Sequence, residues 1–217
     1  TKKVVLDYPA QREVCCHTGG GMAFDKAGNL YLTTGNNTAN PPRGTSNLDE
    51  RPGYENADDQ RTAGNTNDLR GKILRIHPED DGSYTIPEGN LFPEGTPRTR
   101  PEIYTMGHRN PWRLSIDSQT GYIYWGEVGP DASEDTDYGP RGYDEFNQAR
   151  GPGFFGWPYF IGDNKPYVDY DFEAETLGQP FDPARPVNDS PNNTGLTELP
   201  PAQPAFLWYP YGASEAF

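Results

Sequence analysis

The sequence predicts an all-β protein built as a β-propeller, of which this chain holds only a part. Short runs rich in β-branched and aromatic residues recur along the chain, and each is bounded by Gly, Pro, Asn or Asp, as strands are. No stretch of helical length carries apolar residues at helical spacing without an interrupting Gly or Pro. A hairpin pattern also repeats within the chain. Together these observations favour short antiparallel strands with long connections, as in a propeller.

The repeated hairpin supports the strand assignment. MAFDKAGNLYLTTG matches LSIDSQTGYIYWGEVG once one residue is inserted in the turn. Asp25 with Gly28, and Asp117 with Gly121, are expected to form tight turns, because Gly accepts positive φ and Asp can bond the turn amides. The two aspartates lie 92 residues apart, about two blades of roughly 40–50 residues each. In chain order, the expected strands are Met22–Phe24, Leu30–Thr34, Lys72–His77, Glu102–Thr105, Arg113–Asp117, Tyr122–Gly126 and Ala205–Tyr209.

The length of the chain limits the number of blades. Its 217 residues include long insertions at 36–70, 128–152 and 163–203, so about three to four blades are expected rather than a closed ring. The final motif, PAFLWYPYGASEAF, has the pattern of a strand that opens a further blade. Residues 1–217 are therefore expected to be part of one propeller domain whose remaining blades are missing from this chain.

The composition and net charge of the chain indicate an ordered protein and argue against nucleic-acid binding. The chain has 25 glycines and 23 prolines, yet 13% of it is aromatic, which argues for an ordered, loop-rich protein because disordered chains are poor in aromatic residues. The net charge of −14 would repel phosphate backbones, so nucleic acid is not expected as a partner. This charge suits an extracellular protein or one that binds cations. No apolar run is long enough for a membrane span, and the opening TKKVVLDYPA does not have the pattern of a signal peptide.

Both cysteines of the chain are adjacent, at Cys15 and Cys16, and precede one of its three histidines. Neighbouring Cα atoms lie about 3.8 Å apart across a trans peptide, which is closer than unstrained disulfides prefer. A vicinal disulfide in a strained ring is therefore one interpretation. The alternatives are two free thiols, one of them buried on a strand, and a metal site shared with His17.

His17 stands before three glycines, in HTGGGM, at the entry to a predicted strand. The glycines remove side chains, so a flat group could lie close over the backbone there. Histidine suits proton abstraction near neutral pH, which makes His17 a candidate general base. A purely structural histidine is the alternative interpretation.

A second candidate cluster is GHRNP, in a turn between two predicted strands. Arg109 presents a planar, permanently charged fork that suits carboxylates or quinone oxygens, and Asn110 follows it directly. The alternative for this cluster is a salt bridge between blades.

A third candidate cluster is the acidic segment 124–148, which carries seven carboxylates in a loop rich in Gly and Pro. Hard oxygen donors in such a loop can hold Ca²⁺, including through backbone carbonyls. For Asp131–Asp137 we favour the simpler interpretation of a solvated acidic loop.

These motifs, taken in order, resemble the glucose/sorbosone dehydrogenase family. The resemblance rests on CHTGGGMAFDKAGNLYLTTG, NDLRGKILRIHP, EIYTMGHRNPWRLSID, WGEVGPD, GYDEFNQARGPGFFGWPYFIGDN and PAFLWYPYG, and covers roughly residues 13–212. It implies a six-bladed propeller of four-stranded antiparallel blades that binds pyrroloquinoline quinone (PQQ) and Ca²⁺. It also implies oxidation of a sugar or related alcohol, with electrons passed to a cytochrome or quinone acceptor, in a periplasmic or extracellular protein.

The resemblance implies a role for several residues. His17 would be the general base that takes the proton from the sugar hydroxyl as hydride passes to the quinone. Arg109 and Asn110 would contact the quinone oxygens, and the backbone carbonyls of Gly129 and Pro130 would bind Ca²⁺. Family members contact the PQQ carboxylates from later blades, so this chain alone is not expected to hold PQQ.

Two positions depart from the family pattern. Sugar-oxidising members often carry an Asp just before the catalytic histidine and another after the following hairpin, where this chain has Cys16 and Asn36. A carboxylate would orient His17 and raise its basicity more strongly than either residue. By analogy with another quinoprotein family, a Cys15–Cys16 ring would form a stiff apolar wall beside the quinone. The departures leave open an alternative function, a calcium-stabilised, non-catalytic propeller that acts as an extracellular binding module.

Overall fold

The computed structural model describes residues 2–13, 15–38 and 46–212, and β-strands are their main regular elements. Within these ranges the one helical element is a short 3-10 turn, η1 (Glu55–Ala57), and no helix is long and apolar enough to cross a membrane. The all-β prediction is therefore confirmed. The strands are β1 (Met22–Phe24), β2 (Leu30–Thr34), β3 (Lys72–Pro78), β4 (Tyr84–Thr85), β5 (Ile103–Met106), β6 (Pro111–Ile116), β7 (Ile123–Glu127), β8 (Tyr143–Ala149), β9 (Gly153–Phe154), β10 (Phe160–Ile161), β11 (Lys165–Pro166), β12 (Val168–Asp171), β13 (Thr176–Pro180) and β14 (Leu207–Pro210).

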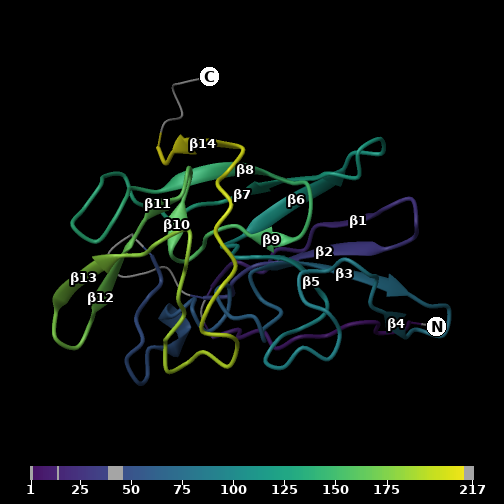
Figure 1. The fold of residues 1–217 in the computed structure, drawn as a ribbon, viewed down its shortest axis with the longest axis horizontal. Helices are drawn as coiled ribbons and strands as arrows, with labels where there is room; N and C mark the ends of the chain where they lie inside the picture. Colours follow the sequence, from purple (N-terminus) through teal and green to yellow (C-terminus); the bar gives the residue numbers. More distant parts are fainter. Residues whose placement is uncertain (1, 14, 39–45, 213–217) are drawn as a thin grey trace.

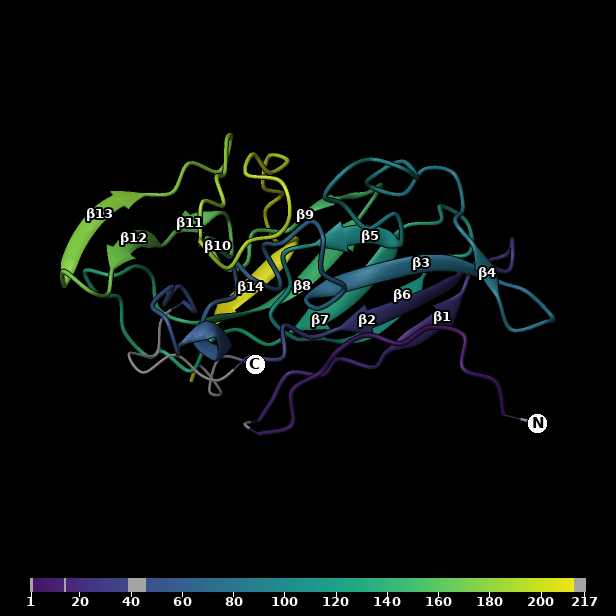
Figure 2. The ribbon, with the colours of Figure 1, turned by 90° about the horizontal axis from the view of Figure 1, so that it is seen from below.

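Two sheets carry most of the structure (Figure 1). The first sheet has the order β1-β2-β3-β5-β9, with β4 paired to β3, and the second sheet has the order β14-β8-β7-β6. Neighbouring strands are antiparallel, except for the parallel pair β5–β9. Each sheet therefore contains a run of four antiparallel strands, the form of a propeller blade. The hairpins β10–β11 and β12–β13 form separate two-stranded sheets, and β12–β13 lies at the opposite end of the molecule from β1 and β4 (Figure 2).

The two repeated hairpins, β1–β2 and β6–β7, turn as the sequence predicts. Asp25 Oδ1 and Asp117 Oδ1 each accept a hydrogen bond from the amide two residues further along, at 2.9 Å. Gly28 and Gly121 follow them with φ of 84° and 75°, in the left-handed region that glycine enters without strain. The same turn chemistry therefore closes both hairpins, although the β6–β7 turn is one residue longer than the β1–β2 turn.

The two sheets pack face to face. Tyr31 on β2, Ile73 on β3 and Tyr104 on β5 share one buried cluster with Ile123 and Trp125 of β7. The opposite face of the first sheet is covered by loops and by the segment that follows β9. This second cluster includes Leu74, Ile103 and Met106 of the first sheet with Leu48, Leu69, Phe154, Trp157, Tyr159 and Phe160. The first sheet is therefore covered on both faces.

The expected strands correspond to β1, β2, β3, β5, β6, β7 and β14. The expected count of about three to four blades is not reached, because the described residues form two four-stranded sheets. Much of the remaining chain, within 46–70 and 155–205, forms loops and short hairpins that cover the first sheet instead of building further sheets.

Candidate functional site

The sequence-predicted candidates come from three separate segments, and main-chain and side-chain hydrogen bonds join them. His17 lies before β1, the GHRNP turn joins β5 to β6, and Gly129 follows β7. The Asn110 side-chain oxygen accepts from the amide of Gly19 at 3.2 Å, across 91 residues of sequence. The Arg109 carbonyl accepts from the amide of Asn36 at 2.8 Å. The structure therefore brings the histidine segment and the GHRNP turn together at one end of the two sheets.

His17 is held by the hairpin that follows it. Its Nδ1 lies 2.9 Å from Asn36 Oδ1, and its carbonyl accepts from the amide of Asn37 at 3.0 Å. Burial first, and then the charge of Arg109, lower the pKa of His17 to about 4. The imidazole is therefore uncharged at neutral pH. A Cβ on Gly35 would collide with the His17 carbonyl, so glycine is required for this close approach.

Arg109 is buried and directed toward the segment after β7. Its Nη1 donates to the carbonyl of Gly129 at 2.7 Å and lies 3.3 Å from that of Val128. Its guanidinium carbon lies 5.8 Å from the ring centre of Trp157. The arginine therefore links the GHRNP turn to Gly129, one of the two residues that the resemblance implies for Ca²⁺ binding.

His108, which precedes Arg109, has a structural position. It is fully buried, with Nδ1 3.0 Å from Glu127 Oε2 and Nε2 2.8 Å from Thr105 Oγ1. Glu127 also accepts from the amide of Arg109 at 2.5 Å. His108 therefore joins Thr105 of β5 to Glu127 of β7, and Glu127 also fixes the backbone at Arg109. The salt bridge between blades stays an untested alternative for this cluster.

The two carbonyls predicted to bind Ca²⁺ already have hydrogen-bond donors. Arg109 donates to the Gly129 carbonyl, as described, and the amide of Ala132 donates to the Pro130 carbonyl at 2.8 Å. Most of the acidic side chains in Asp131–Asp137 face solvent. Within the described ranges, no group of three or more His, Cys, Asp or Glu side chains is arranged to hold a metal ion.

Cys15 and Cys16 lie next to this site. The structure pairs their sulfur atoms across a cis peptide bond, with the two Cα atoms 3.1 Å apart. A count of free thiols in the native protein would test the vicinal disulfide, which stays a prediction.

Sequence reasoning missed the buried carboxylate behind Asn36. Asn36 Nδ2 donates to Asp59 Oδ2 at 2.5 Å, and the indole nitrogen of Trp157 donates to the same oxygen at 2.5 Å. Asp59 is fully buried, and burial raises its pKa while its hydrogen bonds act in the opposite direction. The sequence around it, NADDQRT, gives no sign of this contact, because it lies in a loop far along the chain from His17.

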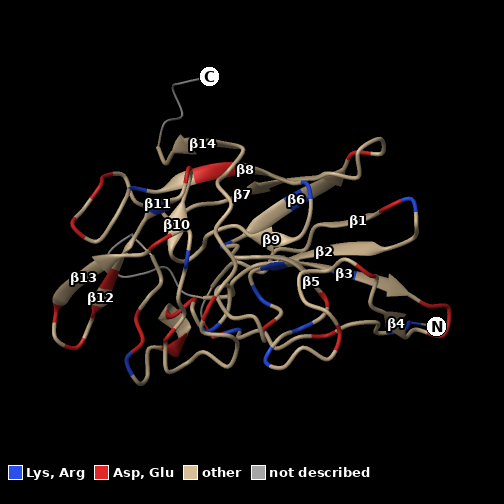
Figure 3. Ribbon diagram, in the orientation of Figure 1, with Lys and Arg blue, Asp and Glu red and all other residues tan. Residues whose placement is uncertain are grey.

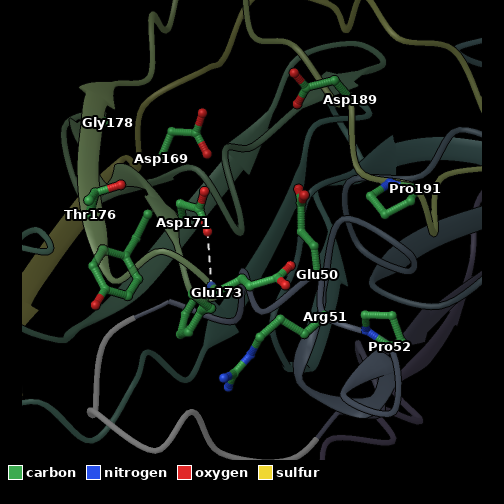
Figure 4. Close-up of a pocket in the computed structure, with 12 residues that line it drawn as sticks. Glu50, Arg51, Pro52, Asp169, Asp171, Glu173, Thr176, Gly178, Asp189 and Pro191 are labelled. Atoms are coloured by element: carbon green, nitrogen blue, oxygen red, sulfur yellow. Dashed lines mark hydrogen bonds between the residues drawn. The ribbon is translucent and has the colours of Figure 1, made fainter.

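A separate hollow of about 480 Å³ lies between the loop that carries Glu50, the β12–β13 hairpin and the loop that carries Asp189 (Figure 4). Its lining is acidic, as are several loops and strand ends of this molecule (Figure 3). Burial, and then the charges of nearby aspartates, raise the pKa of Glu50 to about 7. This hollow is distant in sequence from the His17 segment, and we assign it no function.

Comparison with known proteins places the chain in a family. The family model described as glucose/sorbosone dehydrogenase matches residues 1–186. The chain belongs to this family. The resemblance predicted from the sequence motifs is therefore confirmed.

Curated relatives are much longer than this chain. The HIPL2 protein of Arabidopsis thaliana is 32% identical over 163 residues, which are 69% of this chain and 19% of that protein. The aldose sugar dehydrogenase YliI of Escherichia coli (strain K12) is 28% identical over 142 residues, which are 65% of this chain and 29% of that protein. The chain thus matches less than a third of the length of either relative.

Solved structures that resemble this chain are also longer than the part that it matches. An oxidoreductase of Thermus thermophilus, described as a glucose dehydrogenase, superposes with a TM-score of 0.52 at 27% identity, and the match covers 95% of this chain and 42% of that one. Another glucose dehydrogenase structure gives a TM-score of 0.53 at 22% identity and supports the fold alone, with 94% of this chain and 42% of that chain covered. The chain is therefore a partial propeller.

Proposed function

We propose that this chain forms part of a PQQ- and Ca²⁺-dependent dehydrogenase that oxidises a sugar or a related alcohol. Family membership gives the general class. The observation that carries the proposal is the meeting of His17 with the Arg109–Asn110 turn, since a proton acceptor, a fixed positive charge and an amide then lie at one place.

His17 is suited to act as the general base. Because its pKa is lowered to about 4, the ring carries no proton on one nitrogen at neutral pH and can accept one from a substrate hydroxyl. Because the pKa of His17 is lowered, kcat/KM should fall with decreasing pH only near pH 4, below the pH at which an ordinary histidine takes up a proton. Since the charge of Arg109 helps to lower the pKa of His17, removal of that charge should shift this fall in kcat/KM to higher pH.

The groups around His17 fit an anionic quinone. Arg109 carries a permanent positive charge and Asn110 an amide, both suited to carbonyl and carboxylate oxygens. A Cβ on Gly20 would meet no atom within 4 Å, so the backbone beside the histidine faces open space. When bound, PQQ supplies the two-electron acceptor for the hydride that leaves the substrate. The chain's own residues orient the ligand and accept the proton.

Calcium fits the described residues less completely. The carbonyls of Gly129 and Pro130 are hard oxygen donors, but Ca²⁺ takes about six to eight oxygens. Arg109 also donates to the first of these carbonyls. We therefore keep Ca²⁺ as a ligand to be tested and derive no step through it.

The location and the electron acceptor are part of the same proposal. The net charge of −14 suits an extracellular protein, and a Cys15–Cys16 disulfide, if the thiol count finds one, would fit an oxidising, exported setting. In such a compartment, a cytochrome or quinone acceptor would take the electrons from the reduced cofactor.

The direct test compares two histidine variants of the native protein after incubation with PQQ and Ca²⁺. In dye-linked sugar oxidation, His17→Ala should lose at least ~100-fold in kcat, the usual worth of a general base. His77→Ala is the matched control, because His77 contacts Asn29 on the first sheet and should change kcat by less than about twofold. Equal rates for wild type and His17→Ala would contradict the assignment. A wild-type protein that binds quinone but oxidises no sugar would favour the binding module.

A further inference from the structure

The contacts behind Asn36 suggest how the chain positions His17 without a directly contacting carboxylate. Asn36, Asp59 and Trp157 are all buried, and each bond that joins them is 2.5 Å long. Asp59 Oδ1 accepts two more hydrogen bonds, from the hydroxyls of Thr38 at 2.6 Å and Thr62 at 3.1 Å. The carboxylate is therefore surrounded by donors on both oxygens.

The donors fix one Asp59 oxygen as a hydrogen-bond acceptor. The indole nitrogen of Trp157 can only donate, so Asp59 Oδ2 accepts from it. The Asn36 side chain then turns its NH₂ group, and not its oxygen, toward the same atom. The remaining amide oxygen of Asn36 faces the other way, toward the ring of His17.

The orientation of Asn36 in turn selects the tautomer of His17. Because Asn36 Oδ1 is an acceptor, the ring nitrogen 2.9 Å from it must be the one that carries hydrogen. The amide of Thr38, 3.4 Å from the same oxygen, supports this orientation. Nε2 of an uncharged His17 is then left with a free lone pair, which is what a general base requires.

We infer that Asp59 is a positioning residue that acts through Asn36 to hold His17 in the Nδ1–H tautomer, with Nε2 as the proton acceptor. The inference rests on the proposed function for its catalytic consequence, but not for the tautomer itself. Asp59 thus orients the His17 ring through Asn36, a role for which the sequence analysis expected a carboxylate in direct contact with the histidine.

The first measurement is the ring ¹⁵N spectrum of histidine-labelled protein at pH 7. The chain has three histidines, so His17→Gln identifies the His17 signals by their loss. We expect a protonated Nδ1 and an unprotonated Nε2. A protonated Nε2 in the wild-type protein would overturn the inference, whether or not any variant folds.

The second measurement uses Asp59→Asn with Asp58→Asn as the matched control. Both aspartates are fully buried and adjacent, but Asp58 bonds the side chains of Ser190 and Asn192, not Asn36. In Asp59→Asn, the amide of Asn36 loses its fixed acceptor, so the His17 signals should shift toward the Nε2–H tautomer or a mixture. Asp58→Asn should leave them unchanged. Retention of Nδ1–H in Asp59→Asn would overturn the role of Asp59.

A kinetic readout separates this inference from the proposed function. In sugar oxidation by the native protein with PQQ and Ca²⁺, Asp59→Asn should lower kcat at least tenfold with KM changed less than twofold. If Asp59→Asn does not fold, Asn36→Ser breaks the same relay at its end nearest His17 and should give the same tautomer shift. A wild type with the expected tautomer but no quinone-dependent activity would refute the proposed function and leave the relay standing.

Discussion

The two hairpins of the internal repeat have the same local structure but different surroundings. On the first sheet, the rings of Tyr31 and Tyr104 meet edge to face at 5.3 Å, and the two residues are 5% and 8% exposed. On the second sheet, Tyr124 occupies the place of Tyr31 in the repeat and meets Phe206 edge to face at 6.5 Å, yet Phe206 is 52% exposed. The repeat therefore determines the antiparallel hairpin and the place of the tyrosine in it, whereas the neighbouring sheet determines burial.

The strand pairings extend this comparison. Ile73 pairs with Thr33 on the first sheet as Phe146 pairs with Gly126 on the second. Ile73 is fully buried against the second sheet, whereas Phe146 is 52% exposed. In the ranges that the structure describes, the Phe146 face has no sheet packed against it as the Ile73 face has.

The largest expected effect tests this difference in burial. Ile73→Ala should lower the free energy of unfolding by about 3 kcal/mol, because it leaves a cavity between the two sheets. Phe146→Ala should cost less than about 1 kcal/mol, although it removes a larger side chain. Urea unfolding of both variants measures the contrast. Equal costs would show that the Phe146 face is buried in solution, for example by a further sheet in a longer form of the protein.

A second pair of equivalent positions carries a basic and an acidic side chain. Lys72 pairs with Thr34 on the first sheet, and Glu145 pairs with Glu127 on the second. Lys72 Nζ donates to the carbonyls of Thr62, Ala63 and Arg70 at 2.7–3.1 Å. Glu145 instead accepts from the amide of Gly162 at 2.6 Å and from Asn147 Nδ2 at 3.0 Å. The Lys72 side chain therefore anchors the loop that carries Thr62 and Ala63, and the Glu145 side chain anchors the backbone at Gly162.

Substitution of the two side chains should have opposite results at alkaline pH. Lys72→Met should lower the free energy of unfolding by about 2 kcal/mol, since buried carbonyls lose their donor. Burial and the charge of Glu127 raise the pKa of Glu145. The folded state therefore holds that proton more tightly than the unfolded state, and stability falls as the pH rises from about 4.5 through the raised pKa.

Glu145→Gln removes this titration. The variant should be more stable than wild type at pH 9 and similar to it at pH 4, as measured by thermal unfolding at both values. If Glu145→Gln destabilises the fold at pH 9, the ionised carboxylate is itself required by its two donors, and the comparison with Lys72 fails.

The smallest expected effect concerns the two turns. Gly28→Ala and Gly121→Ala each place a Cβ at positive φ, which should cost about 1 kcal/mol. A Cβ on Gly28 would also lie 3.3 Å from the His77 ring, whereas the space beside Gly121 is open. Gly28→Ala should therefore be the more destabilising of the two in urea unfolding. The reverse order would mean that the two turns are not equivalent.

The parts of the fold that could be predicted are those that local chemistry determines. The turns at Gly28 and Gly121 need only four or five neighbouring residues, so the hairpins were predicted with nearly correct bounds. β8 was missed because its buried face presents Glu145 and Asn147, so the strand lacks the usual apolar alternation. Burial of these side chains depends on partners far along the chain.

The candidate site also contains residues that the sequence could predict and residues that only the folded structure identifies. The residue types of His17, Arg109 and Asn110 and their place beside turns were visible in the sequence, and the structure brings their segments together. Asp59 was not predicted, because only the folded loop places it against Asn36. The Arg109 contact with the Gly129 carbonyl was not predicted either, since it depends on the pairing register of β6 and β7, which places Pro111 opposite Glu127 and so brings the segments at the two ends of this hairpin together.

The most direct test of the account is a titration of the full-length native protein with PQQ in the presence and absence of Ca²⁺, followed by absorbance, for wild type and Arg109→Gln. We expect saturable binding that Ca²⁺ strengthens, reduction of the bound quinone on addition of sugar, and binding at least tenfold weaker in Arg109→Gln. Absence of PQQ binding by the folded native protein, with or without Ca²⁺, would contradict the proposed quinone site and favour a binding module instead.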